Sequence, residues 1–311
     1  MAEKVVVLGS FVVDLMGRSD HLPVPGETVM GSFFKLGPGG KGSNQAVAAH
    51  RAGADVHLLT KVGTDVFRSV ALDFYQAEGM DCSYIFEDEE NSTGVALILV
   101  DEHTSENSIL VHSGACANIS QSEVHKADSL FSSCKILLCQ LEINLDVMPY
   151  AVETVHRNGG LTVLNPAPAR KIDPAFIGMF DLVTPNEIEA SILTGVEVKD
   201  LGSAEQAAQV FNSMGVADVI ITMGSQGAYV KAAGNSGKML PACKVDVVDS
   251  TGAGDAFNGG LVTALAEGKS LEDAARFAMA TAGLSVTKIG TAPSMPHRQE
   301  IDRLMEKLRW D

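Results

Sequence analysis

The chain has 311 residues, of which 46% are hydrophobic and 20% are charged. This length and composition allow one sizeable buried core with a small appendage, and they exclude disorder over any long segment. The formal net charge of −16 argues against nucleic acid or an anionic membrane surface as the main partner, because both attract clustered positive charge.

The five cysteines contain no C-x-x-C pair, which favours buried reduced thiols over a disulfide framework or a zinc site. The apolar run over residues 5–13 ends at Asp14 without a small-residue cleavage pattern, as is typical of a first buried strand rather than a secretory signal. No stretch approaches the roughly 20 apolar residues of a membrane span. We therefore expect the protein to be cytoplasmic.

Short β-branched runs alternate with helical patterns along most of the chain. The strands are predicted over residues 5–9, 56–60, 136–139, 162–165, 182–184 and 219–222, and the helices over residues 43–53, 66–79, 147–158, 187–193 and 204–214. This alternation predicts a mainly parallel sheet with helices on both faces. Ligands of such sheets bind beyond the carboxyl ends of the strands.

Two regions interrupt the alternation. Residues 28–35 and 94–112 are predicted as strands with no helix between them, the second as a pair joined near residues 102–106. They predict a small antiparallel sheet drawn from about residues 11–37 and 93–113, although an extension of the main sheet is the alternative. The remaining helices are predicted over residues 252–268, 271–287 and 296–308. With no repeat or long linker, residues 1–311 are expected to form one α/β domain.

Two glycine-rich stretches each lead into a predicted helix. They are G-P-G-G-K-G-S-N over residues 37–44 and D-S-T-G-A-G-D over residues 249–255. A helix entered through glycines presents unpaired backbone N–H groups, which can bind an anion. Neither stretch has the spacing of a Walker A loop or of a dinucleotide-binding G-x-G-x-x-G motif. They therefore predict an anion site of another kind.

Asp255, at the end of the second stretch, is the candidate general base. Acidic residues in a first helical turn also simply stabilise the helix dipole, by about 0.3–1 kcal/mol. The preceding Gly252, Ala253 and Gly254 favour a catalytic role, because small residues let backbone N–H groups approach a transferring phosphoryl group. The helix dipole is expected to favour the ionised form of Asp255.

The two stretches together resemble the paired signatures of the ribokinase family of sugar kinases. Further segments match that family in the same order: Asp14, L-N-P-A-P-A over residues 164–169, T-P-N-E-I-E over residues 184–189 and G-T-A-P-S over residues 290–294. The resemblance covers essentially the whole chain. It implies a ribokinase-like three-layer α/β sandwich, in which the small β sheet is a lid over the sugar and a common dimer surface.

The resemblance implies ATP-dependent phosphorylation of the primary hydroxyl of a small sugar, with D-ribose as the leading acceptor. The residues it assigns to the sugar hydroxyls are Asp14, Gly39, Gly40, Lys41, Asn44 and Glu142. Ribokinases often carry Asn where this chain has Val12, so 2-deoxyribose, fructose, a ketose phosphate or a nucleoside stays open as the acceptor. Phosphorylated acceptors need a positive pocket, and the lid segments show no obvious Arg or Lys cluster.

The same resemblance assigns the nucleotide and metal sites. For Mg²⁺ and its waters it implies Asn186 and Glu189, for ATP the turn at Thr222, Gly224, Ser225 and Gly227, and for K⁺ Asp249, Thr251, Ser285, Lys288, Gly290 and Ser294. A helix cap at Asn186 and a plain tight turn after Thr222 are the alternatives. A catalytically silent sugar-binding regulator is the alternative from another functional class, and the presence of Asp255, Asn186 and Glu189 disfavours it.

Overall fold

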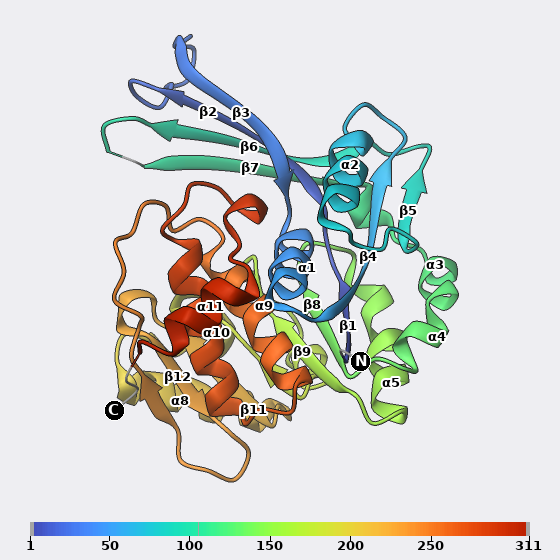
Figure 1. The fold of residues 1–311 in the computed structure, drawn as a ribbon, viewed down its shortest axis with the longest axis vertical. Coiled ribbons are helices and arrows are strands. Elements are labelled where there is room, and N and C mark those ends of the chain that lie inside the picture. The colour runs from blue at the N-terminus through green and yellow to red at the C-terminus, as the bar shows by residue number, and fades with distance from the viewer. Residues whose placement is uncertain (1–2, 105, 309–311) are drawn as a thin grey trace.

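The computed structural model describes residues 3–104 and 106–308 (Figure 1). Within these residues the main sheet has nine strands in the order β13-β12-β11-β10-β9-β8-β1-β4-β5. Their bounds are β1 (Lys4–Leu8), β4 (Asp55–Gly63), β5 (Ile85–Asp88), β8 (Ile136–Gln140), β9 (Leu161–Asn165), β10 (Leu182–Val183), β11 (Asp218–Thr222), β12 (Ala228–Lys231) and β13 (Lys238–Leu240). The strands from β11 to β5 pair in parallel, and β12 and β13 add an antiparallel edge. The predicted mainly parallel sheet is confirmed.

Helices cover both faces of this sheet (Figure 1). One face packs against α1 (Lys41–Ala52), α2 (Arg68–Glu78), α9 (Ala253–Ala266), α10 (Leu271–Ser285) and α11 (Arg298–Met305). The other packs against α3 (Gln121–Lys126), α4 (Asp128–Phe131), α5 (Met148–Arg157), α6 (Pro174–Ile177), α7 (Glu187–Thr194) and α8 (Leu201–Met214). Successive strand residues serve opposite cores, as Val5 and Val6 do in β1. No helix in the described part of the chain has both the length and the apolar character of a membrane span.

A second sheet, the lid sheet, projects from the main body at the top of Figure 1. It has the order β3-β2-β6-β7, with β2 (Val12–Ser19), β3 (Gly31–Gly39), β6 (Thr93–Asp101) and β7 (Asn107–Gly114). The outer pairs β2–β3 and β6–β7 are antiparallel as predicted, whereas β2 and β6 run in parallel. The middle pair is parallel because β2 and β6 both leave the main body in the same direction. Residue 105, inside the predicted connection 102–106, lies outside the described residues.

Several elements differ from the sequence prediction. The strands β5, β12 and β13 were not predicted, because they have only four, four and three residues and show too little periodicity to be recognised. The last helix, predicted over residues 296–308, is limited to Arg298–Met305. The first helix begins at Lys41 rather than at residue 43. This earlier start places Lys41 in the first helical turn.

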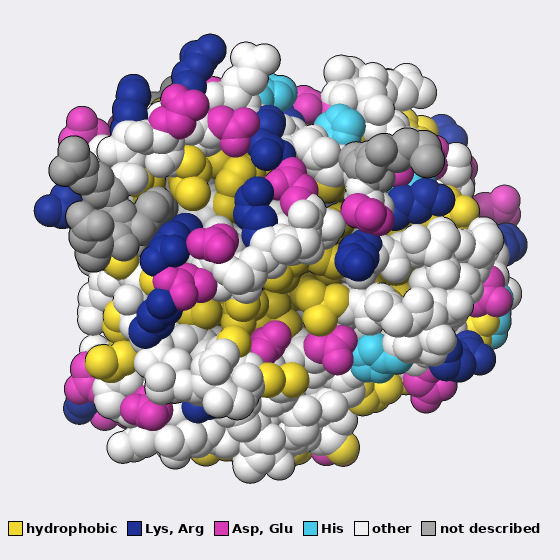
Figure 2. Space-filling view, turned by 60° about the horizontal axis from the view of Figure 1, so that its bottom comes forward, with side chains coloured by type: hydrophobic (Ala, Val, Ile, Leu, Met, Phe, Trp, Pro, Cys, Tyr) yellow, Lys and Arg dark blue, Asp and Glu magenta, His cyan; other side chains and the backbone are white. Residues whose placement is uncertain are grey.

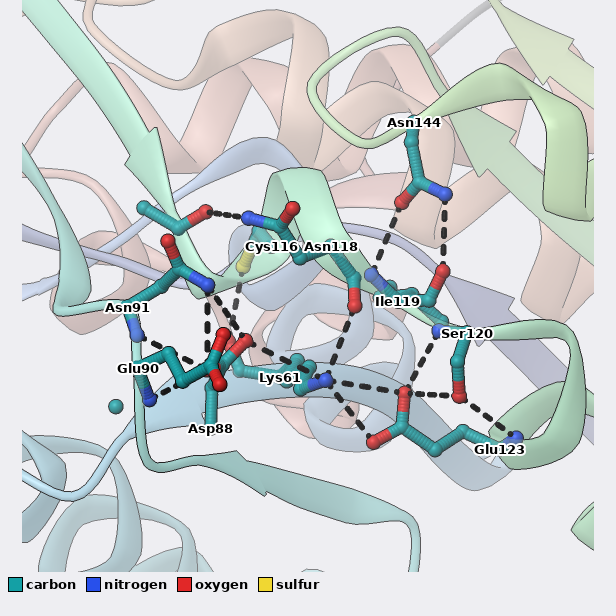
Figure 3. A network of polar contacts seen from close by, with 12 residues as sticks. Lys61, Asp88, Glu90, Asn91, Cys116, Asn118, Ile119, Ser120, Glu123 and Asn144 are labelled. Carbon is teal, nitrogen blue, oxygen red and sulfur yellow. Dashed lines mark hydrogen bonds and ion pairs between the residues drawn. The ribbon is translucent and has the colours of Figure 1, made fainter.

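A network of ion pairs and hydrogen bonds connects β4 with the segment that precedes β6 and the segment that follows β7 in the lid sheet (Figure 3). The Nζ atom of Lys61 lies 3.4 Å from the carboxylate of Asp88 and 3.1 Å from that of Glu123, and it donates to the backbone carbonyl of Asn118 at 3.0 Å. Asp88 also accepts the backbone N–H of Asn91, just before β6 begins. Glu123 lies beyond the end of β7. Lys61 therefore links the chain segments on both sides of the lid sheet.

Candidate active site

Two cavities contain most of the predicted site residues. One, here called the lid cavity, has a volume of about 120 Å³ and lies between the lid sheet and the loops over residues 248–251 and 290–293, where Asp14 lines it. The other, here called the cradle cavity, has a volume of about 170 Å³ and is lined by Lys41, by Glu189 and by residues 252–255. The second glycine-rich stretch thus forms a wall of the cradle cavity.

Asp255 occupies the third position of α9 and is 7% exposed. Its carboxylate accepts hydrogen bonds from Asn44 Nδ2 and Gln45 Nε2, each at 2.9 Å. Burial raises the pKa of Asp255, while the charge of Lys41 and these two hydrogen bonds oppose the rise. The prediction that the helix dipole favours the ionised form omitted this burial. The neighbouring donors therefore become necessary for Asp255 to act as a base at neutral pH.

The start of α9 presents unpaired amides to the cradle cavity. Gly252 provides the turn into the helix with φ of +79°. The N–H of Ala253 donates to the Ser250 carbonyl at 3.2 Å, whereas no described residue accepts from the N–H groups of Gly254 and Asp255. A Cβ built on Gly254 would meet no atom within 4 Å, so this residue borders open space. Two free amides in a polar cavity fit an anion such as a phosphoryl group.

Lys41 serves the site through both its backbone and its side chain. Its backbone N–H donates to Glu142 Oε2 at 2.9 Å, and the same oxygen accepts from Ser10 Oγ at 2.5 Å. Burial alone would lower the pKa of the Lys41 ammonium group. The carboxylates of Asp255, Glu142 and Glu189 outweigh burial and raise that pKa, so the group stays charged. The side chain lines the cradle cavity rather than the lid cavity.

Asp14 and Asn44 offer hydrogen-bonding atoms to a polyol. Asp14 lies in β2 and accepts from Thr291 Oγ1 at 3.0 Å, and burial raises the pKa of its carboxyl group to about 6. Asn44 Oδ1 is buried without a partner among the described residues. Gly39 leaves room for the Asp14 carboxylate, which a Cβ would strike, and Gly40 is the N-cap residue of α1 with φ of +87°. Neither glycine lines a cavity, so their observed role is close packing.

Asn186 and Glu189 form a capping box at the start of α7, and both line the cradle cavity. Asn186 Oδ1 accepts the Glu189 N–H at 2.7 Å, and Glu189 Oε2 accepts the Asn186 N–H at 2.9 Å. Burial raises the pKa of Glu189. The second carboxylate oxygen lies outside the cap. Among the described residues no group of three or more His, Cys, Asp or Glu could hold a metal ion, so a divalent ion here needs phosphate oxygens and water as further ligands.

The predicted nucleotide turn follows β11. Thr222 lines the cradle cavity, and Gly224 and Ser225 are exposed in the short turn after it. Gly227 differs, because it has φ of +108° and a Cβ there would collide with the Leu240 carbonyl in β13. Three of the four residues are therefore accessible to a ligand, and Gly227 is required for packing.

Part of the predicted K⁺ site lies at the lid cavity. Asp249 accepts the backbone N–H of Thr251 at 2.9 Å and that of Gly290 at 3.0 Å, and all three residues line this cavity. Burial raises the pKa of Asp249, but the hydrogen bonds that its carboxylate accepts outweigh burial and hold this pKa below its ordinary value. The other predicted residues line neither cavity: Ser285, Lys288 and Ser294.

Sequence reasoning missed several polar residues that the structure brings to the site. Arg18 and Lys35 line the lid cavity, where no Arg or Lys cluster was expected, and Asp14 and Asp249 line the same cavity and balance their charge. The further missed residues are Gln45, Asn165, Thr184, Asn258 and Thr291. Asn165 had a detectable signal, because a polar residue ends an otherwise apolar strand there.

Residues 2–298 match the model of the pfkB family carbohydrate kinase. A ribokinase from Haemophilus influenzae is 41% identical, with 98% of this chain and 99% of that protein covered. A deoxyribokinase from Salmonella typhi is 35% identical, with coverages of 97% and 98%. The structure of an Arabidopsis thaliana ribokinase complexed with ribose and ATP matches with a TM-score of 0.88 at 28% identity, covering 98% of this chain and 99% of that one. The chain therefore belongs to the pfkB family of carbohydrate kinases.

Proposed function

We propose that this protein transfers the γ-phosphoryl group of ATP to the primary hydroxyl of a small sugar, with D-ribose as the first candidate acceptor. The observation that carries the proposal is the enclosed carboxylate of Asp255 beside two free amides at the start of α9. A base next to an anion cradle is the arrangement that phosphoryl transfer to an alcohol requires. The similarity to ribokinases over the whole chain supports the same activity.

In the proposed reaction Asp255 accepts the proton of the primary hydroxyl while that oxygen attacks the γ-phosphorus. The bond between the γ-phosphorus and the bridging oxygen breaks, and ADP leaves with its electron pair. The amides of Gly254 and Asp255 and the ammonium group of Lys41 stabilise the charge that develops on the phosphoryl oxygens. Asn186 and Glu189 would hold Mg²⁺ through water, and the ion would neutralise part of the phosphate charge.

We assign the sugar to the space between Asp14 and Asp255. The Asp14 carboxylate accepts from vicinal hydroxyls, and the unpartnered Oδ1 of Asn44 accepts from a further hydroxyl. Ser10 and Lys41 both donate to Oε2 of Glu142, which leaves its other carboxylate oxygen to accept from the sugar. The lid sheet over this space would exclude water from the reaction.

A second candidate acceptor is 2-deoxyribose. Val12 is 3% exposed and packs in an apolar cluster with Ala96 and Ile98 on the strands that roof the lid cavity. An apolar residue beside Asp14 offers no hydrogen bond to a 2-hydroxyl. Loss of one such contact changes preference by roughly 1–3 kcal/mol. The likeness to a deoxyribokinase supports keeping this acceptor beside ribose.

We propose K⁺ as a structural cation near Asp249. Its carboxylate joins the loop before the cradle to the loop at Gly290, and the Val286 carbonyl accepts the backbone N–H groups of Val248 and Asp249. A large, weakly polarising ion suits a site of backbone carbonyls and one carboxylate. Turnover measured with K⁺, and with Na⁺ at the same ionic strength, tests the assignment.

We propose a homodimer that forms through the lid sheet. The face of this sheet turned away from the lid cavity exposes large apolar side chains, among them Phe34 at 67% and Leu110 at 61%. Contiguous exposed apolar side chains mark interaction surfaces. Light scattering of the protein, compared with that of a Phe34→Asp variant, tests the dimer.

The charge distribution supports small molecules as the partners, rather than nucleic acid or membranes. Figure 2 shows Lys and Arg side chains interspersed with Asp and Glu on the face of the molecule that it draws. The five cysteines carry free thiols, which supports a reducing compartment. We therefore propose the cytoplasm as the location.

Replacement of Asp255 tests the proposed function. Asp255→Ala is expected to lower kcat by about 10²–10⁴-fold, because it removes the general base. ATP binding, measured by calorimetry, should persist. A coupled ADP-release assay over pentoses, 2-deoxyribose, hexoses and nucleosides identifies the acceptor. If Asp255→Ala retained most of its turnover, the assignment of the base would be wrong.

A further inference from the structure

Behind Asp255 lies a buried amide that the proposed reaction does not use. Gln45 is 0% exposed, and its Nε2 donates to both Asp255 Oδ1 and Asn165 Oδ1, each at 2.9 Å. Its Oε1 accepts from Gln140 Nε2 at 2.7 Å. Both hydrogens and the oxygen of the Gln45 amide are therefore engaged. A reversed amide would direct its oxygen at a carboxylate, so these contacts fix its donor side toward Asp255.

The hydrogen bonds continue from Asn165 back to the anion cradle. Asn165 Nδ2 donates to the Thr184 carbonyl at 3.0 Å, and Thr184 Oγ1 donates to Asn258 Oδ1 at 2.6 Å. Asn258 Nδ2 then donates to the Gly254 carbonyl at 2.8 Å. These side chains are at most 6% exposed. One closed set of contacts thus holds both the carboxylate of Asp255 and the peptide that forms the cradle.

We propose that Gln45 is a positioning residue for proton transfer, which holds the Asp255 carboxylate in its proton-accepting state and in register with the Gly254 amide. This inference rests on the proposed function. Gln45 is fully buried and every polar atom of its amide is engaged by the protein, so it acts through Asp255 and does not contact the substrates.

The charges around Asp255 explain why a neutral donor is suited to this position. Lys41 on α1 is the nearby cation, and the carboxylates that face Asp255 are Asp14 on β2, Glu142 after β8 and Glu189 on α7. Burial and these carboxylates favour the protonated form of Asp255. A hydrogen bond from Gln45 favours the charged form and adds no ion that needs its own partner.

Gln45→Met tests the inference, because methionine has a similar volume and no hydrogen-bond donor. The expected result is a kcat lower by roughly 10–100-fold, since a hydrogen bond to a charged group is lost. The KM for the sugar should change by less than about twofold, because the sugar contacts stay in place. The acid limb of the kcat profile should move to higher pH by roughly one unit, since Asp255 then binds its proton more tightly.

Two matched variants complete the experiment. Gln206→Met, on the exposed face of α8, controls for the substitution itself and should leave kcat and the pH profile unchanged. Gln140→Met retains the donor to Asp255 but removes the partner that fixes its direction, so it should shift the acid limb by a smaller amount. This variant gives the answer if Gln45→Met fails to fold.

A titration without turnover separates this inference from the proposed function. In protein with ¹³C-labelled aspartate carboxyl groups, the Asp255 signal is identified by its loss in Asp255→Asn. Its midpoint should rise in Gln45→Met and stay unchanged in Gln206→Met. An unchanged midpoint and acid limb in folded Gln45→Met would overturn the inference. If the wild-type protein phosphorylates no acceptor but the Asp255 midpoint still rises in Gln45→Met, only the proposed function is overturned.

Discussion

Adding one methyl group at Gly254 should change stability and activity in opposite directions. Gly254 is the second residue of α9, its φ lies outside the positive range, and a Cβ there meets no atom within 4 Å. Alanine fits this backbone without strain and loses less conformational entropy than glycine on folding. We therefore expect Gly254→Ala to raise the free energy of unfolding by about 0.5–1 kcal/mol, measured by urea denaturation.

The same methyl group should impair phosphoryl transfer. It would enter the cradle cavity beside the free N–H groups of Gly254 and Asp255, where the proposed phosphoryl oxygens are bound. Loss of one donor to a developing oxyanion costs about 10²–10³-fold in kcat. We expect a decrease of this size in the ADP-release assay, with little change in the KM for the sugar.

Gly202→Ala is the matched control, because Gly202 is also the second residue of its helix, α8, and is exposed. It should give a similar gain in stability with wild-type turnover. Wild-type kcat in a folded Gly254→Ala variant would refute the placement of the phosphoryl group at the start of α9. An equal loss of kcat in both variants would show that the effect has no relation to the cradle.

Two further predictions concern the lid. Lys61→Met should lower the free energy of unfolding by about 3–5 kcal/mol, because it leaves the buried carboxylate of Asp88 and the half-buried carboxylate of Glu123 without their cation. Lys199→Met, which breaks an exposed ion pair, should change the free energy of unfolding by less than about 1 kcal/mol. Equal urea midpoints for the two variants would contradict this reasoning. The KM for the sugar should rise as the pH falls through about 6, because the carboxylate of Asp14 that accepts hydrogen bonds from the hydroxyls is then protonated. In Asp14→Asn the KM should be higher and constant from about pH 5 to 7. A pH-dependent KM in that variant would assign the titration to another group.

The fold was predictable wherever a segment is long or uniformly apolar. The strands β1, β8 and β9 are buried on both faces, and their sequences are accordingly mostly apolar runs without alternation. The edge strands β5 and β13 were not predictable, since an edge strand of three or four residues is defined by its neighbour rather than by its own pattern. The parallel pairing of β2 with β6 depends on how both strands leave the body, which no local pattern encodes.

The candidate site was predictable where a motif fixes the backbone, and less so where packing decides the contacts. The glycine-rich stretch before Asp255 led directly to the cradle. In contrast, the side-chain direction of Lys41 and the contact between Gln45 and Asn165 depend on how α1 lies against the sheet. The proton affinity of Asp255 depends on burial, which the sequence around it does not reveal.

The junction between β3 and α1 has a mechanical consequence. The strand ends at Gly39 and the helix begins at Lys41, so a single residue, Gly40, separates the lid sheet from the turn that carries Asn44 and Gln45. Any tilt of the lid sheet about Gly40 would therefore tend to displace the two side-chain amides that donate to Asp255. Such a tilt would couple the proposed enclosure of the sugar to the alignment of the proposed base through one residue of the backbone.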